Sequence, residues 1–269
     1  MNKTILITGS TDGIGKLTAL QLAKSGHTVY LHGRNNARLE STIQEVREAS
    51  GSKNVHGFLA DFSDLGAVSQ MAEEVISQLA KLDILINNAG VYNSKASTNQ
   101  DGLDYRFVVN YLAPYLLTER LMPLLKKSSS PRIINLGSAA QAPVNSSALL
   151  GKEQLTEQAA YAQSKLALTM WTFDLASKQP GLNALVVNPG SLLDTKMAHE
   201  AFGQVWAPAE KGADVLFDLA LSEEHENASG KYFDNDQGRF GQAHPYAYDQ
   251  TKIDQLMSIT EKLVYNISK

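Results

Sequence analysis

The sequence predicts an α/β fold, with a doubly wound parallel sheet of about seven strands and helices on both faces. Short β-branched or aliphatic runs alternate along the chain with longer stretches of helical periodicity. A glycine-rich turn stands between the first such run and the first helical stretch. Strand–helix units in series imply parallel strands whose connecting helices cover both faces of one sheet.

The expected strands are short and apolar. The run at 83–86 is almost purely apolar, as expected of a strand that is buried on both faces of a parallel sheet. In chain order the seven expected strands are Thr4–Thr8, Thr28–Leu31, Val55–Leu59, Asp83–Ile86, Arg132–Leu136, Asn183–Val187 and Lys231–Phe233.

The segments between these strands have helical periodicity. The first helix follows Ile14, and the later ones are expected at Ala37–Ala49, Leu65–Leu79, Leu103–Lys126, Ala159–Ala176, Ala209–Leu221 and, as a terminal amphipathic helix, Ile253–Val264. Two longer stretches, 142–158 and 234–250, have no regular pattern, and irregular stretches of this length often serve as lids or binding loops.

A length of 269 residues allows one domain or two. The strand–helix series continues without an interdomain linker from residue 3 to about residue 235. We therefore expect a single domain over residues 1–269, with a lid at about 191–207 and a C-terminal tail at about 234–269.

Composition excludes several classes of protein. Lysine and arginine number 24 against 28 aspartates and glutamates, so a net charge of −4 favours neither nucleic acid nor an anionic membrane as a partner. The chain has no cysteine, which excludes disulfides, thiol catalysis and cysteine-ligated metals. No apolar run reaches the roughly 18 residues of a membrane span, and the first strand starts too early for a signal peptide, so we expect a cytoplasmic protein.

Histidines could suggest a metal site, but their positions do not. None of the six has the paired spacing that metal ligands usually show. We expect no metal and interpret the histidines as structural or surface residues: His27, His32, His56, His199, His225 and His244.

The glycine-rich turn predicts a Rossmann-type dinucleotide site. Its three glycines would form a tight turn, let the backbone approach a pyrophosphate, and let the first helix pack closely on the first strand. The pyrophosphate would then lie against the free amides at the start of that helix. The turn consists of Thr8, Gly9, Ser10, Thr11, Asp12, Gly13, Ile14 and Gly15.

The end of the second strand predicts which dinucleotide is bound. Enzymes that use NAD usually have a carboxylate here for the ribose 2′-hydroxyl, but this chain has Gly33, Arg34 and Asn35. A guanidinium binds phosphate with paired, charge-assisted hydrogen bonds, which suits the extra phosphate of NADP. We therefore expect NADP(H) in preference to NAD(H).

Tyr161 and Lys165 are four residues apart in helical sequence, so both project from one face. A nearby ammonium favours a phenolate and is expected to lower the tyrosine pKa, which suits a general acid or base. Such a pair is more often structural when it stands alone. Here it follows a phosphate turn and a strand that leads to Ser138.

Together these motifs resemble the short-chain dehydrogenase/reductase family in its compact form, over residues 3 to about 235. The resemblance also rests on the Asn87-Asn88-Ala89-Gly90 sequence. It implies a catalytic set of Asn110, Ser138, Tyr161 and Lys165, in which Tyr161 exchanges a proton with the substrate oxygen and Ser138 holds that oxygen. Lys165 would bind the nicotinamide ribose, and Asn110 would hold a water that leads to solvent.

The resemblance also extends the expected cofactor site beyond the glycine turn. Asp61 matches the acid that binds the adenine amino group, and 189–195 matches the segment that holds the nicotinamide carboxamide. The further cofactor residues expected are Asp61, Phe62, Asn88, Ala89, Gly90, Pro189, Gly190, Leu192 and Thr195.

Some positions depart from the family pattern. Asp12 stands where some NADP enzymes have a basic residue, so the NADP preference depends on Arg34 alone. Gly137 replaces a serine, and four residues instead of three separate Gly190 from Thr195. The 22 residues between Ser138 and Tyr161 exceed the usual dozen and resemble the retinol dehydrogenase and carbonyl reductase branches, so we expect a monomer or homodimer instead of a tetramer.

Substrate contacts are expected in the loops that follow the strands. The candidates are Tyr92, Gln141, Val144 and Leu193. An apolar lid and ordinary helix packing explain the segment after the nicotinamide residues equally well; it contains Leu192, Leu193, Met197, Phe202 and Trp206.

These patterns predict an NADP-dependent oxidoreductase that interconverts an alcohol and a carbonyl on a small, mostly apolar molecule. The alternative is a non-catalytic, redox-sensing regulator that binds dinucleotide, although such proteins typically lose the Tyr–Lys pair. A sugar-nucleotide epimerase of the extended form is disfavoured, because neither its glycine spacing nor its longer C-terminal domain is visible.

Overall fold

The computed structural model describes residues 2–94 and 96–267 and contains an eight-stranded sheet. The strands lie in the order β3-β2-β1-β4-β5-β6-β7-β8, and all neighbours are parallel except β7 and β8. Their bounds are β1 Thr4–Ile7, β2 Thr28–Gly33, β3 Val55–Leu59, β4 Ile84–Asn87, β5 Arg132–Leu136, β6 Asn183–Asn188, β7 Tyr232–Asp234 and β8 Arg239–Gly241. The predicted doubly wound parallel sheet is confirmed.

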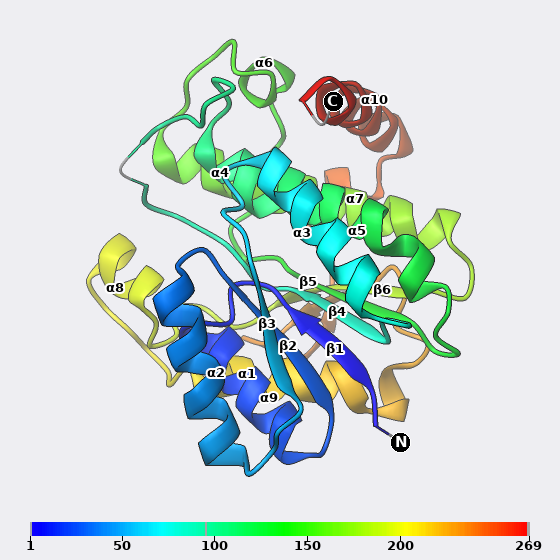
Figure 1. Ribbon diagram of the computed structural model, residues 1–269. Coiled ribbons are helices and arrows are strands. Elements are labelled where there is room, and N and C mark those ends of the chain that lie inside the picture. The colour runs from blue at the N-terminus through cyan, green and yellow to red at the C-terminus, as the bar shows by residue number, and fades with distance from the viewer. Residues whose placement is uncertain (1, 95, 268–269) are drawn as a thin grey trace.

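The helices form two layers (Figure 1). On one face lie α1 (Gly13–Lys24), α2 (Asn36–Ser50) and α9 (Glu210–Leu221), and on the other α3 (Leu65–Gln78), α5 (Ala113–Leu125) and α7 (Glu157–Lys178). Each layer packs its apolar side chains against the sheet in a separate core cluster. The sheet is thus buried on both faces, which explains why its central strands are apolar throughout.

The expected long helix at 103–126 is divided in three. It consists of α4 (Tyr105–Phe107), a π-helical turn η1 (Val108–Leu112) and α5. The π-helical turn contains Asn110, whose side chain is fully buried and bonds to backbone and side-chain groups of other segments. Single π-helical turns are frequent at functional sites because they reorient one side chain of a helix.

Two stretches predicted to be irregular contain short elements. Residues 142–158 include α6 (Ser146–Leu149), and residues 234–250 include β8 and the 3₁₀ turn η3 (Pro245–Tyr248). The prediction of about seven strands missed β8, because a three-residue antiparallel strand has too short a pattern to be recognised. The remaining helices are α8 (Lys196–Phe202), the 3₁₀ turn η2 (Glu223–His225) and α10 (Gln250–Ile267).

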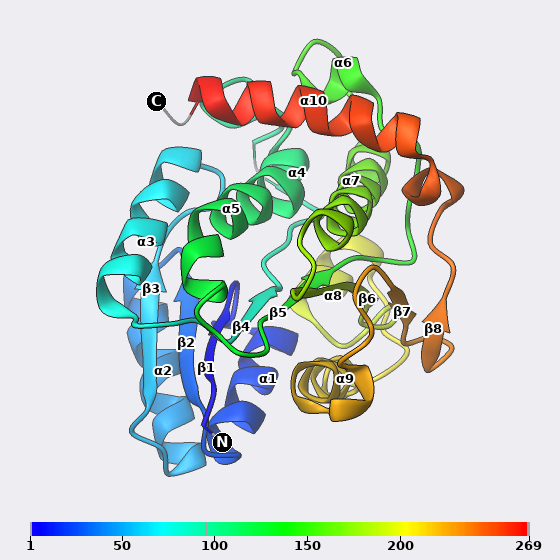
Figure 2. The ribbon, with the colours of Figure 1, turned by 90° about the vertical axis from the view of Figure 1, so that its right-hand side faces the viewer.

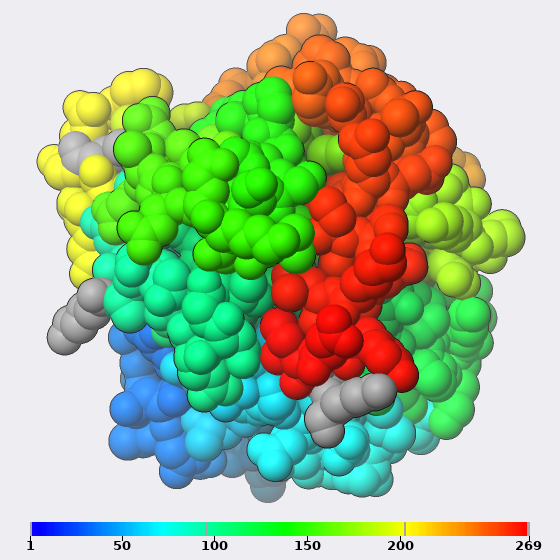
Figure 3. Space-filling model, turned by 90° about the horizontal axis from the view of Figure 1, so that it is seen from above, coloured from blue at the N-terminus to red at the C-terminus, as the bar shows by residue number. Residues whose placement is uncertain are grey.

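The predicted amphipathic terminal helix packs on the body of the protein. α10 runs across the outer side of the α5–α7 layer (Figure 2) and lies on the molecular surface there (Figure 3). Its Ile253, Leu256 and Met257 belong to the core cluster of this layer, and Thr260 bonds Tyr111 of η1 at 2.6 Å. Within residues 2–94 and 96–267, no helix is long and apolar enough to cross a bilayer.

Candidate active site

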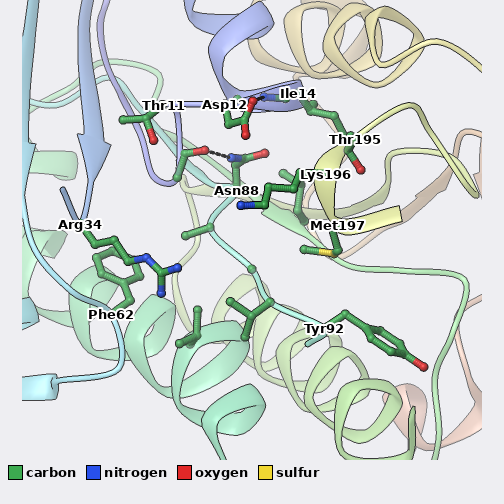
Figure 4. Close-up of a pocket in the computed structure, with 18 of the residues that line it drawn as sticks. Thr11, Asp12, Ile14, Arg34, Phe62, Asn88, Tyr92, Thr195, Lys196 and Met197 are labelled. Carbon is green, nitrogen blue, oxygen red and sulfur yellow. Dashed lines mark hydrogen bonds between the residues drawn. The ribbon is translucent and has the colours of Figure 1, made fainter. Parts of the chain in front are cut away.

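A pocket opens along the carboxyl ends of the parallel strands, and the residues that follow β1 to β6 line it (Figure 4). Ligands of open α/β sheets bind in this place, where connections leave in opposite directions on either side of β1 and β4. Most of the predicted cofactor residues meet here: Gly9, Thr11, Asp12, Gly13, Ile14, Gly15, Gly33, Arg34, Asp61, Phe62, Asn88, Ala89, Gly90, Tyr161, Lys165, Pro189 and Thr195.

The glycine turn is packed too tightly for larger residues. Gly9 has a φ of +63°, and a Cβ on it would lie 2.7 Å from Cα of Ala89. A Cβ on Gly15 would lie 2.4 Å from Nδ2 of Asn88. That Asn88 amide donates to the carbonyls of Thr8 at 2.8 Å and Gly9 at 2.9 Å, so the β4 end holds the turn in place.

Thr8 and Ser10 support the turn from beneath and do not line the pocket. Both side chains are fully buried. Thr8 Oγ1 accepts from the Ala89 amide at 3.0 Å, and Ser10 Oγ donates to the Ile7 carbonyl at 2.8 Å. These two predicted cofactor residues therefore act on the backbone of the turn.

His32 is a pocket residue that the sequence analysis did not assign to the site. Its Nδ1 accepts from the Gly9 amide at 3.0 Å, its Nε2 lies 3.0 Å from the Ala60 carbonyl, and its ring stacks on Phe62. Burial lowers the pKa of His32 to about 4, so the ring is neutral. It joins the ends of β1, β2 and β3, which agrees with the structural interpretation of the histidines.

Two arginines, instead of one, line the end of the pocket beside β2. Arg34 follows the strand as predicted, and Arg38 reaches the same wall from the first turn of α2. Arg38 forms an ion pair with Asp12 at 2.7 Å and donates from Nε to the Thr11 carbonyl at 3.3 Å. Asn35 lies outside the pocket lining and caps α2 by accepting from the Arg38 amide at 2.9 Å.

Of the predicted catalytic residues, Tyr161 and Lys165 line the opposite part of the pocket, whereas Asn110 and Ser138 are not among its lining residues. Lys165 Nζ donates to the Leu136 carbonyl at 2.7 Å and lies 5.7 Å from the centroid of the Tyr161 ring. Asn110 Oδ1 accepts from the Val91 amide at 2.8 Å, and its Nδ2 donates to Val91 O and to Ser164 Oγ, both at 3.0 Å.

Gly90 lies between these two side chains. A Cβ there would be 3.4 Å from Asn110 Oδ1 and 3.5 Å from Lys165 Nζ. The structure thus brings Lys165 to the pocket wall beside Gly90, with Asn110 buried directly behind that wall.

The electrostatics of the pair differ from the expectation. Burial raises the pKa of Tyr161, although a hydrogen bond with Ser138 opposes this, and burial lowers the pKa of Lys165 to about 8. The spacing had predicted a lowered tyrosine pKa. Desolvation outweighs the other influences on both pKa values, since Lys165 is buried and Tyr161 is partly buried, and Tyr161 therefore carries its proton at neutral pH.

The segment around Ser138 is tied to the C-terminal tail. Gln141 donates to the Ser138 carbonyl at 2.9 Å and accepts from the His244 amide at 3.0 Å, while Tyr232 Oη donates to the Ser138 carbonyl at 3.1 Å. Gln141, a predicted substrate residue, thus positions this segment and does not line the pocket.

The other predicted substrate residues lie in different surroundings. Tyr92 lines the pocket, and its ring centroid is 4.9 Å from that of Tyr161. Val144 is partly buried against the core, and Leu193 is buried beneath the loop, against Gly190 and Gly212.

The predicted lid is a loop closed at its base. The Leu192 carbonyl accepts from the Trp206 amide at 2.8 Å, and the Asp194 amide donates to the Ala207 carbonyl at 2.8 Å. Leu192 has a φ of +49°, a strained value for a leucine. Met197 of α8 lines the pocket, Gly190 and Leu192 do not, and the Phe202 side chain lies outside the described part of the structure.

No group of three or more potential metal ligands occurs among the described residues. The expectation that the protein binds no metal stays a prediction.

Comparisons with known proteins agree with this geometry. A family model described as "short chain dehydrogenase" matches residues 3–206. Retinol dehydrogenase 13 of Mus musculus is 34% identical over 255 residues, which cover 86% of this chain and 75% of that protein.

Solved structures have the same fold. A protein from Mycobacterium paratuberculosis has a TM-score of 0.78 at 26% identity, and the match covers 98% of this chain and 93% of that one. A short-chain dehydrogenase of Shigella flexneri complexed with NADP has a TM-score of 0.71 at 27% identity, with 88% and 98% covered. This chain therefore belongs to the short-chain dehydrogenase/reductase family of NAD(P)-dependent oxidoreductases that act on CH–OH groups.

Proposed function

We propose that the protein uses NADP(H) to interconvert a carbonyl and an alcohol on a small, mostly apolar molecule. One observation carries the proposal: the pocket begins at two arginines, passes a glycine turn that admits no Cβ, and reaches a protonated tyrosine beside a buried lysine. The first two features suit the phosphates of a dinucleotide, and the third suits proton transfer.

The cofactor fits the residues present. The turn supplies backbone amides at the start of α1, and the missing Cβ atoms of Gly9 and Gly15 let it pack against Ala89 and Asn88. Arg34 and Arg38 would hold the 2′-phosphate, since no carboxylate follows β2 to receive a 2′-hydroxyl. Asp12 opposes this preference in part because it pairs with Arg38. Bound here, the nicotinamide supplies or accepts the hydride.

Tyr161 is the proton donor during reduction. Its raised pKa keeps the phenol protonated, and Ser138, which interacts with the phenol, would hydrogen-bond the same substrate oxygen. Lys165 lies beside the ring and would bind the ribose hydroxyls next to it. Asn110 holds the Val91 backbone in place at the same wall and would position a water for the return of the proton.

An apolar substrate agrees with the pocket wall at this end. Tyr92, Val91 and Met197 lie there and offer apolar surface to a substrate. Relatives are named for retinol, which is itself a mostly apolar alcohol. We further propose a single domain, with 191–207 as the lid over this wall; the cytoplasmic location and the monomeric or dimeric state stay predictions.

The test is consumption of NADPH and NADH by the purified protein against aliphatic, aromatic, steroid and retinoid carbonyls. We expect turnover with at least one apolar carbonyl and a preference for NADPH. Arg34→Ala should weaken the binding of NADPH and leave the binding of NADH nearly unchanged. Tight NADPH binding without hydride transfer to any carbonyl would instead favour the redox-sensing regulator.

A further inference from the structure

The lid helix α8 presents two opposite charges to the pocket. Lys196 and Glu200 both belong to the pocket lining and form an ion pair at 3.6 Å, with side chains 66% and 54% exposed. A pair this long and this exposed contributes little to stability. Lys196 can therefore leave Glu200 for an anion that binds it more strongly.

The position of Lys196 determines which anion it can reach. Thr195, which caps α8, packs against the glycine turn, because a Cβ on Gly13 would lie 3.6 Å from Thr195 Cγ2. In Figure 4 the Lys196 side chain extends into the pocket between this turn and Met197, while Arg34 lies at the other side. Lys196 is thus next to the turn that binds pyrophosphate and far from the 2′-phosphate end.

The other cationic side chains that line the pocket have partners or lie at other parts of it. Arg38 is paired with Asp12, and Lys165 donates to the Leu136 carbonyl at the catalytic end. Arg34 lines the 2′-phosphate end of the pocket. This leaves Lys196 as the cation placed to neutralise the pyrophosphate charge.

We propose that Lys196 binds the cofactor pyrophosphate by exchanging Glu200 for a phosphate oxygen, and that this holds the lid over the pocket. The inference rests on the proposed cofactor. It extends to the catalytic wall, since Asn93 Nδ2 donates to the Glu200 carbonyl at 2.9 Å and the adjacent Tyr92 packs on Tyr161. Closure of the lid through Lys196 would therefore also hold Asn93 and Tyr92, which lie beside Tyr161.

Binding of NADP⁺ and NAD⁺ by calorimetry separates this role from that of the arginines. Because both cofactors contain the pyrophosphate, Lys196→Gln should lower the affinity for both by the same factor. The expected factor is about tenfold, as for the loss of one charge-assisted contact. Arg34→Ala should weaken NADP⁺ alone. The control, Lys53→Gln, removes the same charge from an exposed residue that precedes β3, at the opposite edge of the sheet.

Lid position has its own reporter. The chain has two tryptophans, of which Trp171 is buried at 1% exposure and Trp206, at the base of the lid, is 71% exposed. Saturating NADP⁺ should change the Trp206 emission in the wild type and in Lys53→Gln, and much less in Lys196→Gln. Trp206→Phe assigns the signal.

Unchanged affinity of Lys196→Gln for both cofactors, or a loss confined to NADP⁺, would overturn the inference while leaving the proposed function intact. Failure of the wild type to bind either cofactor would overturn both. Removal of the competing carboxylate in Glu200→Gln should tighten both cofactors by about twofold, and weaker binding would also contradict the exchange.

Discussion

Lys165 is a buried cation that the fold retains at a cost in stability. It is 4% exposed, and burial lowers its pKa from 10.5 to about 8. At about 1.4 kcal/mol per pKa unit, this difference corresponds to about 3 kcal/mol of destabilisation at neutral pH. We predict that Lys165→Met removes this penalty and so increases the free energy of unfolding.

The net gain in stability from Lys165→Met is smaller than the cost of burying the charged lysine. Lys165 Nζ donates to the buried Leu136 carbonyl at 2.7 Å, and loss of that donor costs about 1 kcal/mol. Lys165→Met should therefore be about 2 kcal/mol more stable than the wild type near neutral pH, while it loses turnover.

The pH dependence of the free energy of unfolding shows whether the lowered pKa of Lys165 causes the difference in stability. Between pH 8 and 10.5 the unfolded chain keeps the lysine proton that the folded protein has lost, so wild-type stability rises with pH in this window. Lys165→Met lacks this rise, and its advantage should shrink to zero or below by the upper end of the window.

Urea unfolding of both proteins at neutral pH and near the upper end of that window measures the effect. Comparison at equal pH cancels the other titrating groups, and Lys53→Met controls for the loss of an exposed lysine. A variant that is less stable than the wild type at neutral pH, or an advantage that does not change with pH, would refute the reasoning.

Three further outcomes are expected. Asp12→Asn should tighten the binding of NADP⁺ severalfold, and that of NAD⁺ by a clearly smaller factor, in calorimetry, because it releases Arg38 from its ion pair; equal effects on both cofactors would contradict that assignment. Gly15→Ala should abolish cofactor binding but keep the circular dichroism of the native protein, since its Cβ would meet Asn88 Nδ2 at 2.4 Å; normal binding would show that the turn can shift. Arg106→Met should destabilise by about 3 kcal/mol in urea unfolding, because the 2% exposed Arg106 bonds Asp104, Glu157 and the Tyr92 carbonyl; a loss below about 1 kcal/mol would mean that these groups find other partners.

The features that the sequence predicted well are local ones. The glycine turn follows directly from β1, and the Tyr161–Lys165 spacing places both side chains on one face of α7. Parallel strand order then brings their loops to one edge of the sheet. Neither the fold class nor the meeting of these residues needs information from distant pairs.

The features that were missed depend on contacts between distant segments. His32 becomes part of the site only because Gly9, Ala60 and Phe62 surround it. The raised pKa of Tyr161 depends on how deeply α7 is buried, which spacing does not reveal. The π-helical turn at Asn110 was missed because its sequence reads as an ordinary helix, and the bond of Asn110 to Ser164 joins segments that are far apart in the sequence.

The second arginine of the cofactor site was hidden for a similar reason. Arg38 lies in the first turn of α2, where a charged residue is typical of an exposed helix face. Only the turn from β2 into α2 brings it to the pocket wall beside Arg34. A basic residue four positions after Arg34 was the available signal.

Proton donation by Tyr161 is the central claim, and single-turnover oxidation of NADPH by Tyr161→Phe in the presence of an accepted carbonyl tests it most directly. Removal of the phenol proton should slow hydride transfer by at least about 100-fold while NADPH affinity stays within about twofold of the wild type. Hydride transfer at a rate close to that of the wild type would contradict the account.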